Sequence, residues 1–310
     1  MSWIKQGLIF KPNGEGGWMI SHAQLPTVLV RTDALRVYFS SRNSDGKSLV
    51  TFLDADMENP SKILYLHKEP ILQLGRPGTF DEDGIMPGCI VEHDGKLLFY
   101  YIGWSRGVTI PYRNAVGLAV SLDGGTTFTR MFEGPIVDRT PNQPYTAMSP
   151  FVMKQQDHWH MWYASGTDWV EVNEKNEPIY IIKYAESQDG IAWKQPNVTC
   201  IAPKDQFEAN TRPTVIKDGS VFRMWYCYRG SHDYRDGTGS YRIGYAESSN
   251  LRDWQRKDAL AGIQPSVQGW DSKMLAYPYV VKTGEKLLMF YNGNGFGRSG
   301  MGYAVWKNTI

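Results

Sequence analysis

The apolar positions of this chain fall into short runs that recur at a regular distance, and five of these runs contain a proline near their start. The runs lie at residues 25–30, 86–91, 149–153, 212–216 and 277–281. Their prolines stand at positions 26, 87, 150, 213 and 278, so consecutive prolines are 61, 63, 63 and 65 residues apart. Spacings this uniform indicate a chain built from one repeated supersecondary unit.

Each period continues with the same succession of turns and alternating apolar segments. A polar turn after the proline run leads to an aromatic segment, such as Leu97–Tyr101 or Phe222–Tyr226. A third segment, such as Ile243–Glu247, follows a variable loop, and a tight turn then leads to a fourth segment opened by Phe128, Trp193 or Trp254. Alternation with a period of two residues and enrichment in aromatic and β-branched side chains predict β-strands, and no helix of consequence is expected.

Four antiparallel strands repeated around an axis predict an all-β fold of the β-propeller type. The ends of the chain predict the number of blades. Only 32 of the 310 residues follow Pro278 and 25 precede Pro26, so both ends together supply about one period. The opening segment Trp3–Phe10 matches the fourth-strand pattern. We therefore predict a single domain over residues 1–310, a five-bladed β-propeller with four antiparallel strands per blade, whose fifth blade the N-terminal strand closes; closure removes an exposed sheet edge.

Long loops are expected on one face of this propeller. Connections from first to second strands and from third to fourth strands are short turns that share the opposite face. The connections from second to third strands are longer and include residues 166–178 and 229–235. Because long loops on a rigid scaffold commonly carry function, we predict a ligand funnel at their face, around the central axis.

Overall composition narrows the classes of function. Lys and Arg total 33 and Asp and Glu total 32, so the net charge of +1 gives no field that would favour nucleic acid. The apolar runs are too short to span a bilayer, and the N-terminus lacks a secretion-signal pattern. The three cysteines cannot all pair. We expect a cytoplasmic protein that binds neither nucleic acid nor membranes and uses no metal or cofactor.

The segments that precede the prolines hold the candidate catalytic groups. Asp83 precedes the second proline, Glu208 the fourth and Asp271 the fifth. Cleavage of a glycosidic bond needs two carboxyl groups around one anomeric carbon, one as acid and the other as base or nucleophile. Carboxylates from different blades that converge on one axis can meet this requirement. The alternative is that they are turn residues or exposed loop charges.

The long-loop face is rich in arginine despite the nearly neutral total charge. Arginine matches carboxylate and phosphate oxygens in a bidentate manner, so we expect a uronate, a sugar phosphate or a nucleotide-sugar; ion pairing with local acids is the alternative. Because a proline follows Arg212, we expect that residue to be extended, with its side chain in the funnel. The candidate substrate-binding residues are His22, Arg42, Asp81, Trp104, Arg113, Ser149, Trp169, Arg212 and Tyr277.

Two resemblances bear on these expectations. The prolines at inner-strand starts and the hairpin Ala185–Trp193 resemble the five-bladed propeller glycoside hydrolases of families 32, 43, 68, 117 and 130, over the whole chain. Family 43-like enzymes carry an Asp directly before the first-blade proline, whereas Leu25 stands there in this chain. Ser121–Phe128 is similar to the Asp-box of the six-bladed sialidases, a structural hairpin, and we interpret it as a turn.

The first resemblance implies a carbohydrate ligand more strongly than it implies hydrolysis, because one fold hosts many functions. Three hypotheses remain. The first is a glycosidase acting on a small sugar or oligosaccharide, which needs two carboxylates. The second is a glycan phosphorylase or glycosyltransferase, which needs one carboxylate and a cationic pocket. The third is a carbohydrate-binding propeller without catalysis, which needs neither.

Overall fold

The computed structural model describes residues 2–235 and 237–307, which form β-strands, turns and one short 3₁₀ helix, η1 (Asp258–Leu260). None of the described residues belongs to an α-helix, so the all-β prediction is confirmed for them. The strands are β1 (Ser2–Phe10), β2 (Ser21–Val30), β3 (Leu35–Arg42), β4 (Ser48–Ala55), β5 (Ile63–Leu66), β6 (Gly84–His93), β7 (Lys96–Arg106), β8 (Tyr112–Ser121), β9 (Thr129–Arg130), β10 (Ala147–Gln155), β11 (His158–Val172), β12 (Lys175–Ser187), β13 (Lys194–Thr199), β14 (Ala209–Asp218), β15 (Val221–Arg229), β16 (Arg242–Ser248), β17 (Gln255–Arg256), β18 (Ala276–Thr283), β19 (Lys286–Asn292) and β20 (Met301–Lys307).

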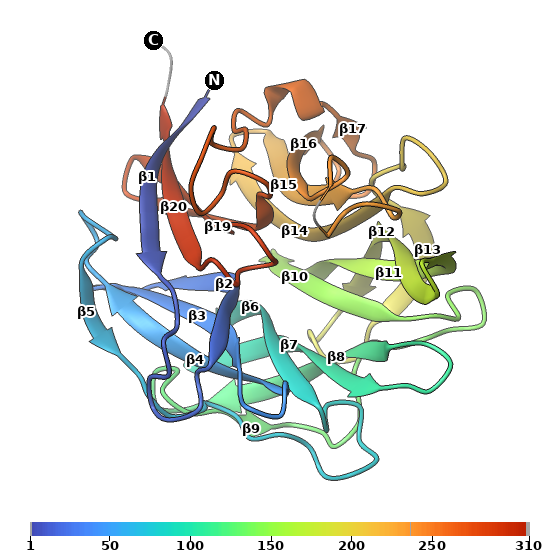
Figure 1. Ribbon diagram of the computed structural model, residues 1–310, viewed down its shortest axis with the longest axis horizontal. Helices are drawn as coiled ribbons and strands as arrows, with labels where there is room; N and C mark the ends of the chain where they lie inside the picture. The colour runs from blue at the N-terminus through green and yellow to red at the C-terminus, as the bar shows by residue number, and fades with distance from the viewer. Residues whose placement is uncertain (1, 236, 308–310) are drawn as a thin grey trace.

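The strands pair in antiparallel sets of four, which we call strand groups. Groups 1 and 2, β2–β5 and β6–β9, are joined into one sheet by a single parallel bridge between Ser48 and Gly84. Groups 3 and 4, β10–β13 and β14–β17, are separate sheets, and group 5 has the order β1-β20-β19-β18. Figure 1 shows the groups arranged around a common centre. The first strands β2, β6, β10, β14 and β18 contact one another in that order, and β18 also contacts β2.

Aromatic side chains on the second strands link neighbouring groups. Each donates a hydrogen bond to a backbone carbonyl in the turn between the third and fourth strands of the next group. The bonds run from Tyr38 to Gly125 (2.8 Å), from Tyr100 to Gly190 (2.8 Å) and from Trp162 to Leu251 (3.0 Å). The segment that resembles an Asp-box supplies the first of these turns, so it contributes to the scaffold. This agrees with its interpretation as a structural hairpin.

The structure differs from the sequence prediction at residues 166–178, which form no long loop. Strand β11 continues to Val172 and β12 begins at Lys175, with Trp169 opposite Pro178 in the register. The two strands are joined by Asn173 and Glu174, whose φ angles of 50° and 62° are left-handed. Two such residues form the kind of turn that closes a tight hairpin, so the segment is a strand pair that extends beyond its neighbours. Among the described residues, no helix is long and apolar enough to cross a bilayer.

Strand β1 supplies the outer edge of group 5, at the opposite end of the chain from its partner β20 (Figure 1). Trp3 is 6% exposed, and its ring lies 5.5 Å from that of Trp225 and 4.8 Å from that of Trp306. The Lys5 ammonium lies 2.7 Å from the Asp271 carboxylate. The N-terminal strand therefore contributes a buried aromatic anchor and an ion pair as well as backbone hydrogen bonds.

Removal of residues 1–10 should accordingly lower the unfolding temperature by at least about 5 °C, because loss of a buried aromatic anchor alone costs about 3–5 kcal/mol. Differential scanning calorimetry of the truncated and full-length chains measures the change. Gln6→Ala, at an exposed position of the same strand, is the control and should leave the temperature nearly unchanged. Equal unfolding temperatures for the truncated and full-length proteins would show that β1 is dispensable.

Candidate functional site

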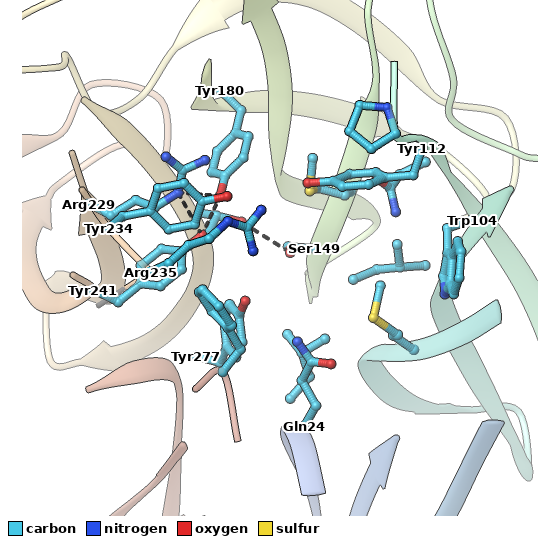
Figure 2. Close-up of a pocket in the computed structure, with 18 of the residues that line it drawn as sticks. Gln24, Trp104, Tyr112, Ser149, Tyr180, Arg229, Tyr234, Arg235, Tyr241 and Tyr277 are labelled. Carbon is cyan, nitrogen blue, oxygen red and sulfur yellow. Dashed lines mark hydrogen bonds between the residues drawn. The ribbon is translucent and has the colours of Figure 1, made fainter. Parts of the chain in front are cut away.

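A cavity of about 440 Å³ lies where the five strand groups meet, and residues from all five line it (Figure 2). Several of them come from the connections between second and third strands, the face on which the sequence predicts a funnel. The lining residues are Gln24, Leu25, Arg42, Met86, Ile102, Trp104, Arg106, Pro111, Tyr112, Asn114, Met148, Ser149, Tyr180, Thr211, Arg229, Tyr234, Arg235, Tyr241, Tyr277 and Phe296.

The residues directly before the prolines contribute to the lining of this cavity. Four of them, Leu25, Met86, Ser149 and Tyr277, line it. Leu25, Ser149 and Tyr277 have φ angles of 59°, 53° and 56°, and the strand register shifts at each of these sites. A bulge of this kind turns a side chain away from the regular alternation of a strand. The proline runs thus supply side chains to the cavity through irregular backbone.

Arg212, which stands directly before Pro213, differs from its sequence prediction. Its φ of 54° is left-handed instead of extended, because the register of β14 against β15 shifts between Thr211 and Thr214. The side chain is 1% exposed and is absent from the cavity lining. The guanidinium donates hydrogen bonds to the carbonyls of Pro26 (3.0 Å), Pro87 (3.1 Å) and Gly88 (2.7 Å) and to the Thr27 hydroxyl (2.7 Å).

These four bonds connect β14 of group 4 with the first strands of groups 1 and 2. Burial lowers the pKa of Arg212 to about 10, which still leaves it charged at neutral pH. No ion pair joins Arg212 to Glu208 or Asp83 in the described structure, so backbone carbonyls and one hydroxyl solvate this buried cation. Its contacts are those of a link across the axis.

Two of the predicted carboxylates, Asp81 and Asp271, hold equivalent positions in groups 2 and 5. Both are buried, at 0% and 2% exposed, and neither lines the cavity. Each accepts a hydrogen bond from the tyrosine that ends the aromatic segment and pairs with a cation of the fourth strand. The contacts are those of Asp81 with Tyr101 (3.0 Å) and Arg130 (2.7 Å), and of Asp271 with Tyr291 (3.0 Å) and Lys5 (2.7 Å).

Glu208 takes part in a related contact in group 4. It is 5% exposed and forms two hydrogen bonds, of 2.6 and 3.1 Å, with Arg256 of β17. In group 3 the uncharged Gln143 accepts the bond from Tyr163 instead, at 2.7 Å. Group 1 has Phe39 at the tyrosine position and no acid before its proline. In groups 2, 4 and 5, the buried acid before the proline is thus paired with a cation of the fourth strand.

Asp83 lies closer to the cavity than these three, since it contacts a lining residue. It is 9% exposed and accepts a hydrogen bond from the backbone N–H of Arg106 at 2.8 Å, while Lys47 lies 3.4 Å away. Burial alone would raise the pKa of Asp83, but the Arg106 N–H and Lys47 outweigh it and hold the pKa below its ordinary value. Asp83 is consequently an ionised carboxylate behind Arg106.

Among the described residues that line the cavity, none is an Asp or a Glu, and four are arginines: Arg42, Arg106, Arg229 and Arg235. Arg235 is paired with Glu177 at 2.9 Å, and Tyr234 donates a hydrogen bond to the same carboxylate. No described group of three or more His, Cys, Asp or Glu residues is arranged to hold a metal ion. The cavity is therefore cationic and rich in aromatic rings. Acids such as Glu177 contact the lining residues but do not line the cavity themselves.

Arg229 organises the wall formed by groups 3 and 4, on the left in Figure 2. It is 1% exposed and donates to the hydroxyls of Tyr180 (3.1 Å) and Tyr241 (3.3 Å) and to the carbonyl of Pro178 (2.7 Å). Its guanidinium also lies 3.7 Å from the centre of the Tyr234 ring. Burial raises the pKa of Tyr241 well above its usual value, so this phenol is neutral. The wall presents fixed phenol groups around one buried cation.

Of the predicted substrate-binding residues, Arg42, Trp104, Ser149 and Tyr277 line the cavity. The others do not. Arg113 is exposed, Trp169 packs edge-on against Tyr112 with ring centres 5.8 Å apart, and His22 is buried beside Ser21. The substrate-binding role of each remains a prediction.

Several lining residues are absent from the sequence prediction, and three of them share a position in the repeat. Asn114, Tyr180 and Tyr241 each stand two residues before the first apolar residue of a third-strand segment, at Val116, Ile182 and Ile243. The repeat alignment contains this signal, but these positions fall where the pattern gives way to variable loops. Arg229 belongs to the arginine-rich long connections that the sequence indicates, whereas Gln24 carries no comparable signal.

Solved structures with this fold include glycoside hydrolases. One glycoside hydrolase has a TM-score of 0.76 at 19% identity and covers 99% of this chain and 92% of its own. A thermostable family-43 glycoside hydrolase has a TM-score of 0.66 at 18% identity, covering 97% and 95%. These TM-scores establish a shared fold, and the resemblance to propeller glycoside hydrolases is confirmed at that level.

No protein-family model matches the chain. The uncharacterized proteins MT1551 and Rv1502, from two strains of Mycobacterium tuberculosis, are each 37% identical to it over 310 residues, 99% of this chain and 100% of theirs. The chain belongs to the same family as these two proteins. The sucrose-6-phosphate hydrolase of Zymomonas mobilis is 33% identical over 109 residues, which is 33% of this chain and 20% of that protein.

The buried bonds of Arg212 predict a large structural effect of its loss. Arg212→Ala should lower the free energy of unfolding by at least about 3 kcal/mol, because four buried acceptors lose their donor. Urea denaturation measures the change. Arg113→Ala, at an exposed position, is the control and should change stability by less than about 0.5 kcal/mol. An Arg212→Ala protein as stable as wild type would contradict the linking role.

His22 should make stability depend on pH. Burial first, and then the charges of Arg42 and Arg298, lower its pKa to about 4, whereas an unfolded histidine titrates near 6.5. The unfolded state therefore binds the proton first, and stability falls as the pH decreases from about 6.5 to about 4. The loss from pH 7 to pH 5 should be about 2 kcal/mol.

His22→Asn should abolish this loss, because asparagine has no group that titrates between pH 7 and pH 5. Asparagine also tolerates the left-handed φ of 67° at that position, so the fold should persist. Urea denaturation at pH 7 and at pH 5 measures both proteins. An unchanged difference between the two pH values in the variant would assign the effect to other groups.

Proposed function

We propose that residues 1–310 form a single five-bladed β-propeller, in which each strand group is one blade and β1 completes the fifth. The pairing of strands in fours supports this proposal. So does the ring of contacts among the first strands, which returns from β18 to β2.

We further propose that the protein is a glycosidase-like carbohydrate-active enzyme that takes an anionic sugar in the central cavity. The observation that carries the proposal is the excess of arginine over acid in a cavity with aromatic walls, within a fold shared with glycoside hydrolases. Aromatic faces pack against the apolar faces of sugar rings, and arginine binds carboxylate or phosphate in a bidentate manner. A volume of about 440 Å³ is within the usual range for small-molecule sites and suits a sugar or a short oligosaccharide.

The local similarity to a sucrose-6-phosphate hydrolase adds support of a different kind. The name of that protein specifies a phosphorylated sugar as its substrate. A phosphate group is one of the anions that an arginine-rich cavity would accept, so the similarity and the charge of the cavity favour the same class of ligand.

For catalysis we propose Asp83 as one carboxylate, because it alone among the predicted acids contacts a lining residue, Arg106. Glu177, which contacts the lining residues Tyr234 and Arg235, is the corresponding acid on another wall. The side chains of Arg106 and Arg235 are 55% and 56% exposed, so both can move and open a path to these acids. Glu208 and Asp271 are engaged in buried ion pairs, which favours a structural role for them.

A second candidate function is a carbohydrate-binding propeller without catalysis. It is favoured by the finding that no acid among the described residues lines the cavity, since direct hydrolysis needs two carboxyl groups at the anomeric carbon.

Turnover and binding measurements separate the two candidates. With phosphorylated disaccharides and aryl glucuronides as substrates, Asp83→Asn should lower kcat/KM at least about 100-fold while sugar binding in calorimetry persists. Glu208→Gln should instead lower the unfolding temperature, because it removes the carboxylate partner of Arg256. Full turnover by Asp83→Asn would contradict its catalytic role. Binding of anionic sugars without turnover by the wild-type protein would establish the second candidate.

A further inference from the structure

Three residues that line the cavity each carry a buried polar atom with no hydrogen-bond partner among the described residues: Nε of Arg42, Oε1 of Gln24 and Oδ1 of Asn114. Gln24 is 7% exposed and Asn114 is 5% exposed, so bulk water reaches these side chains poorly. Buried polar atoms are almost always bonded in folded proteins, and one that is not calls for a partner outside the protein. The three atoms comprise one cationic donor and two acceptors.

The charge around Arg42 is not balanced by an acid. No ion pair of Arg42 occurs among the described residues, and burial followed by the charge of Arg298 lowers its pKa. His22 adds no further positive charge there, since its pKa of about 4 leaves it neutral at neutral pH. Arg235, another cation that acts on Arg42, is paired with Glu177. A half-buried guanidinium without an acid is costly unless an anion binds to it.

An aromatic side chain lines the same cavity as Arg42. Arg42 is opposite Ser48 in the register of β3 and β4, and the Ser48 hydroxyl accepts a hydrogen bond of 2.6 Å from the indole N–H of Trp104. Trp104 also lines the cavity. A ligand held by Arg42 can therefore place a sugar ring against this indole.

We propose that Arg42 binds the oxyanion of the ligand, a carboxylate or a phosphate, while Gln24 and Asn114 accept hydrogen bonds from its hydroxyl groups. The inference rests on the proposed function and adds to it the residues that select the ligand class. A hydroxylated anion satisfies one donor and two acceptors together. A neutral sugar would leave the Arg42 charge unbalanced, and a simple anion would leave both amide oxygens without donors.

Isothermal titration calorimetry on the full chain tests this assignment with glucose, glucose 6-phosphate, glucuronate and inorganic phosphate as probes. Wild type should bind glucose 6-phosphate or glucuronate at least about 10-fold more tightly than glucose or inorganic phosphate, as expected for a charged hydrogen bond. The preferred probe of the two anionic sugars identifies the oxyanion. Arg42→Gln should lose this preference, and Arg42→Lys should restore it only in part, because a point charge lacks the planar fork.

Two further variants make the outcome specific. Asn114→Leu should weaken glucose and the anionic sugars by a similar factor, since it removes an acceptor and leaves the charge. Arg76→Gln, whose side chain is 78% exposed in a surface ion pair with Glu133, is the matched control and should bind like wild type. Arg42→Gln should also unfold at the same temperature as wild type or higher without ligand, because it removes an unpaired charge.

Retention of the anionic preference by Arg42→Gln would overturn the assignment to Arg42 and leave the proposed function standing. Equal wild-type affinity for glucose and both anionic sugars would overturn the anionic ligand class itself. Absence of wild-type binding to all four probes would overturn both the inference and the sugar-binding cavity on which it rests.

Discussion

The structure depends on one buried guanidinium at its axis. Arg212 leaves β14 through a left-handed bulge and binds three carbonyls and a hydroxyl of β2 and β6, two strands more than 120 residues earlier in the chain. Inner strands that converge on an axis present their carbonyls toward one another, and these need donors. A single arginine provides donors for several of them at once. It therefore links three of the five strand groups, and among the described residues it forms no ion pair.

A second constraint explains how a nearly neutral chain acquires a cationic cavity. Asp81, Glu208 and Asp271 each form an ion pair with a cation of a fourth strand and do not line the cavity. Their partners are Arg130, Arg256 and Lys5, respectively. Among the described residues that line the cavity, Arg42 and Arg229 form no ion pair, whereas Arg235 is paired with Glu177. Charge is balanced over the whole molecule but not within the cavity. Local imbalance of this kind selects ligands by their charge.

The same distribution of charged residues bears on whether this chain can share the chemistry of glycoside hydrolases. The fold is shared with those enzymes, and a propeller of this kind presents loops around an axis whatever chemistry they carry. In this chain the positions before the prolines carry Leu25, Met86, Ser149, Arg212 and Tyr277, none of them acidic. Any hydrolytic chemistry must rely on acids behind the lining, such as Asp83 and Glu177, and the family that includes MT1551 and Rv1502 is the place to test that arrangement.

The sequence by itself determined the order of the strands and the pairing of β1 with the last group, because period-two alternation and uniform proline spacing can be read along the chain. It did not indicate that β11 and β12 extend over residues 166–178. It also indicated Arg42, Trp104, Ser149 and Tyr277, since they belong to the repeat or to its long connections. Tertiary structure decided the rest. Whether Asp81 faces the axis or pairs with Arg130, 49 residues later, depends on bulges and partners that no local pattern encodes. The direction of a side chain at an irregular backbone position is set by packing, so the direction of Arg212 became clear only in the folded chain.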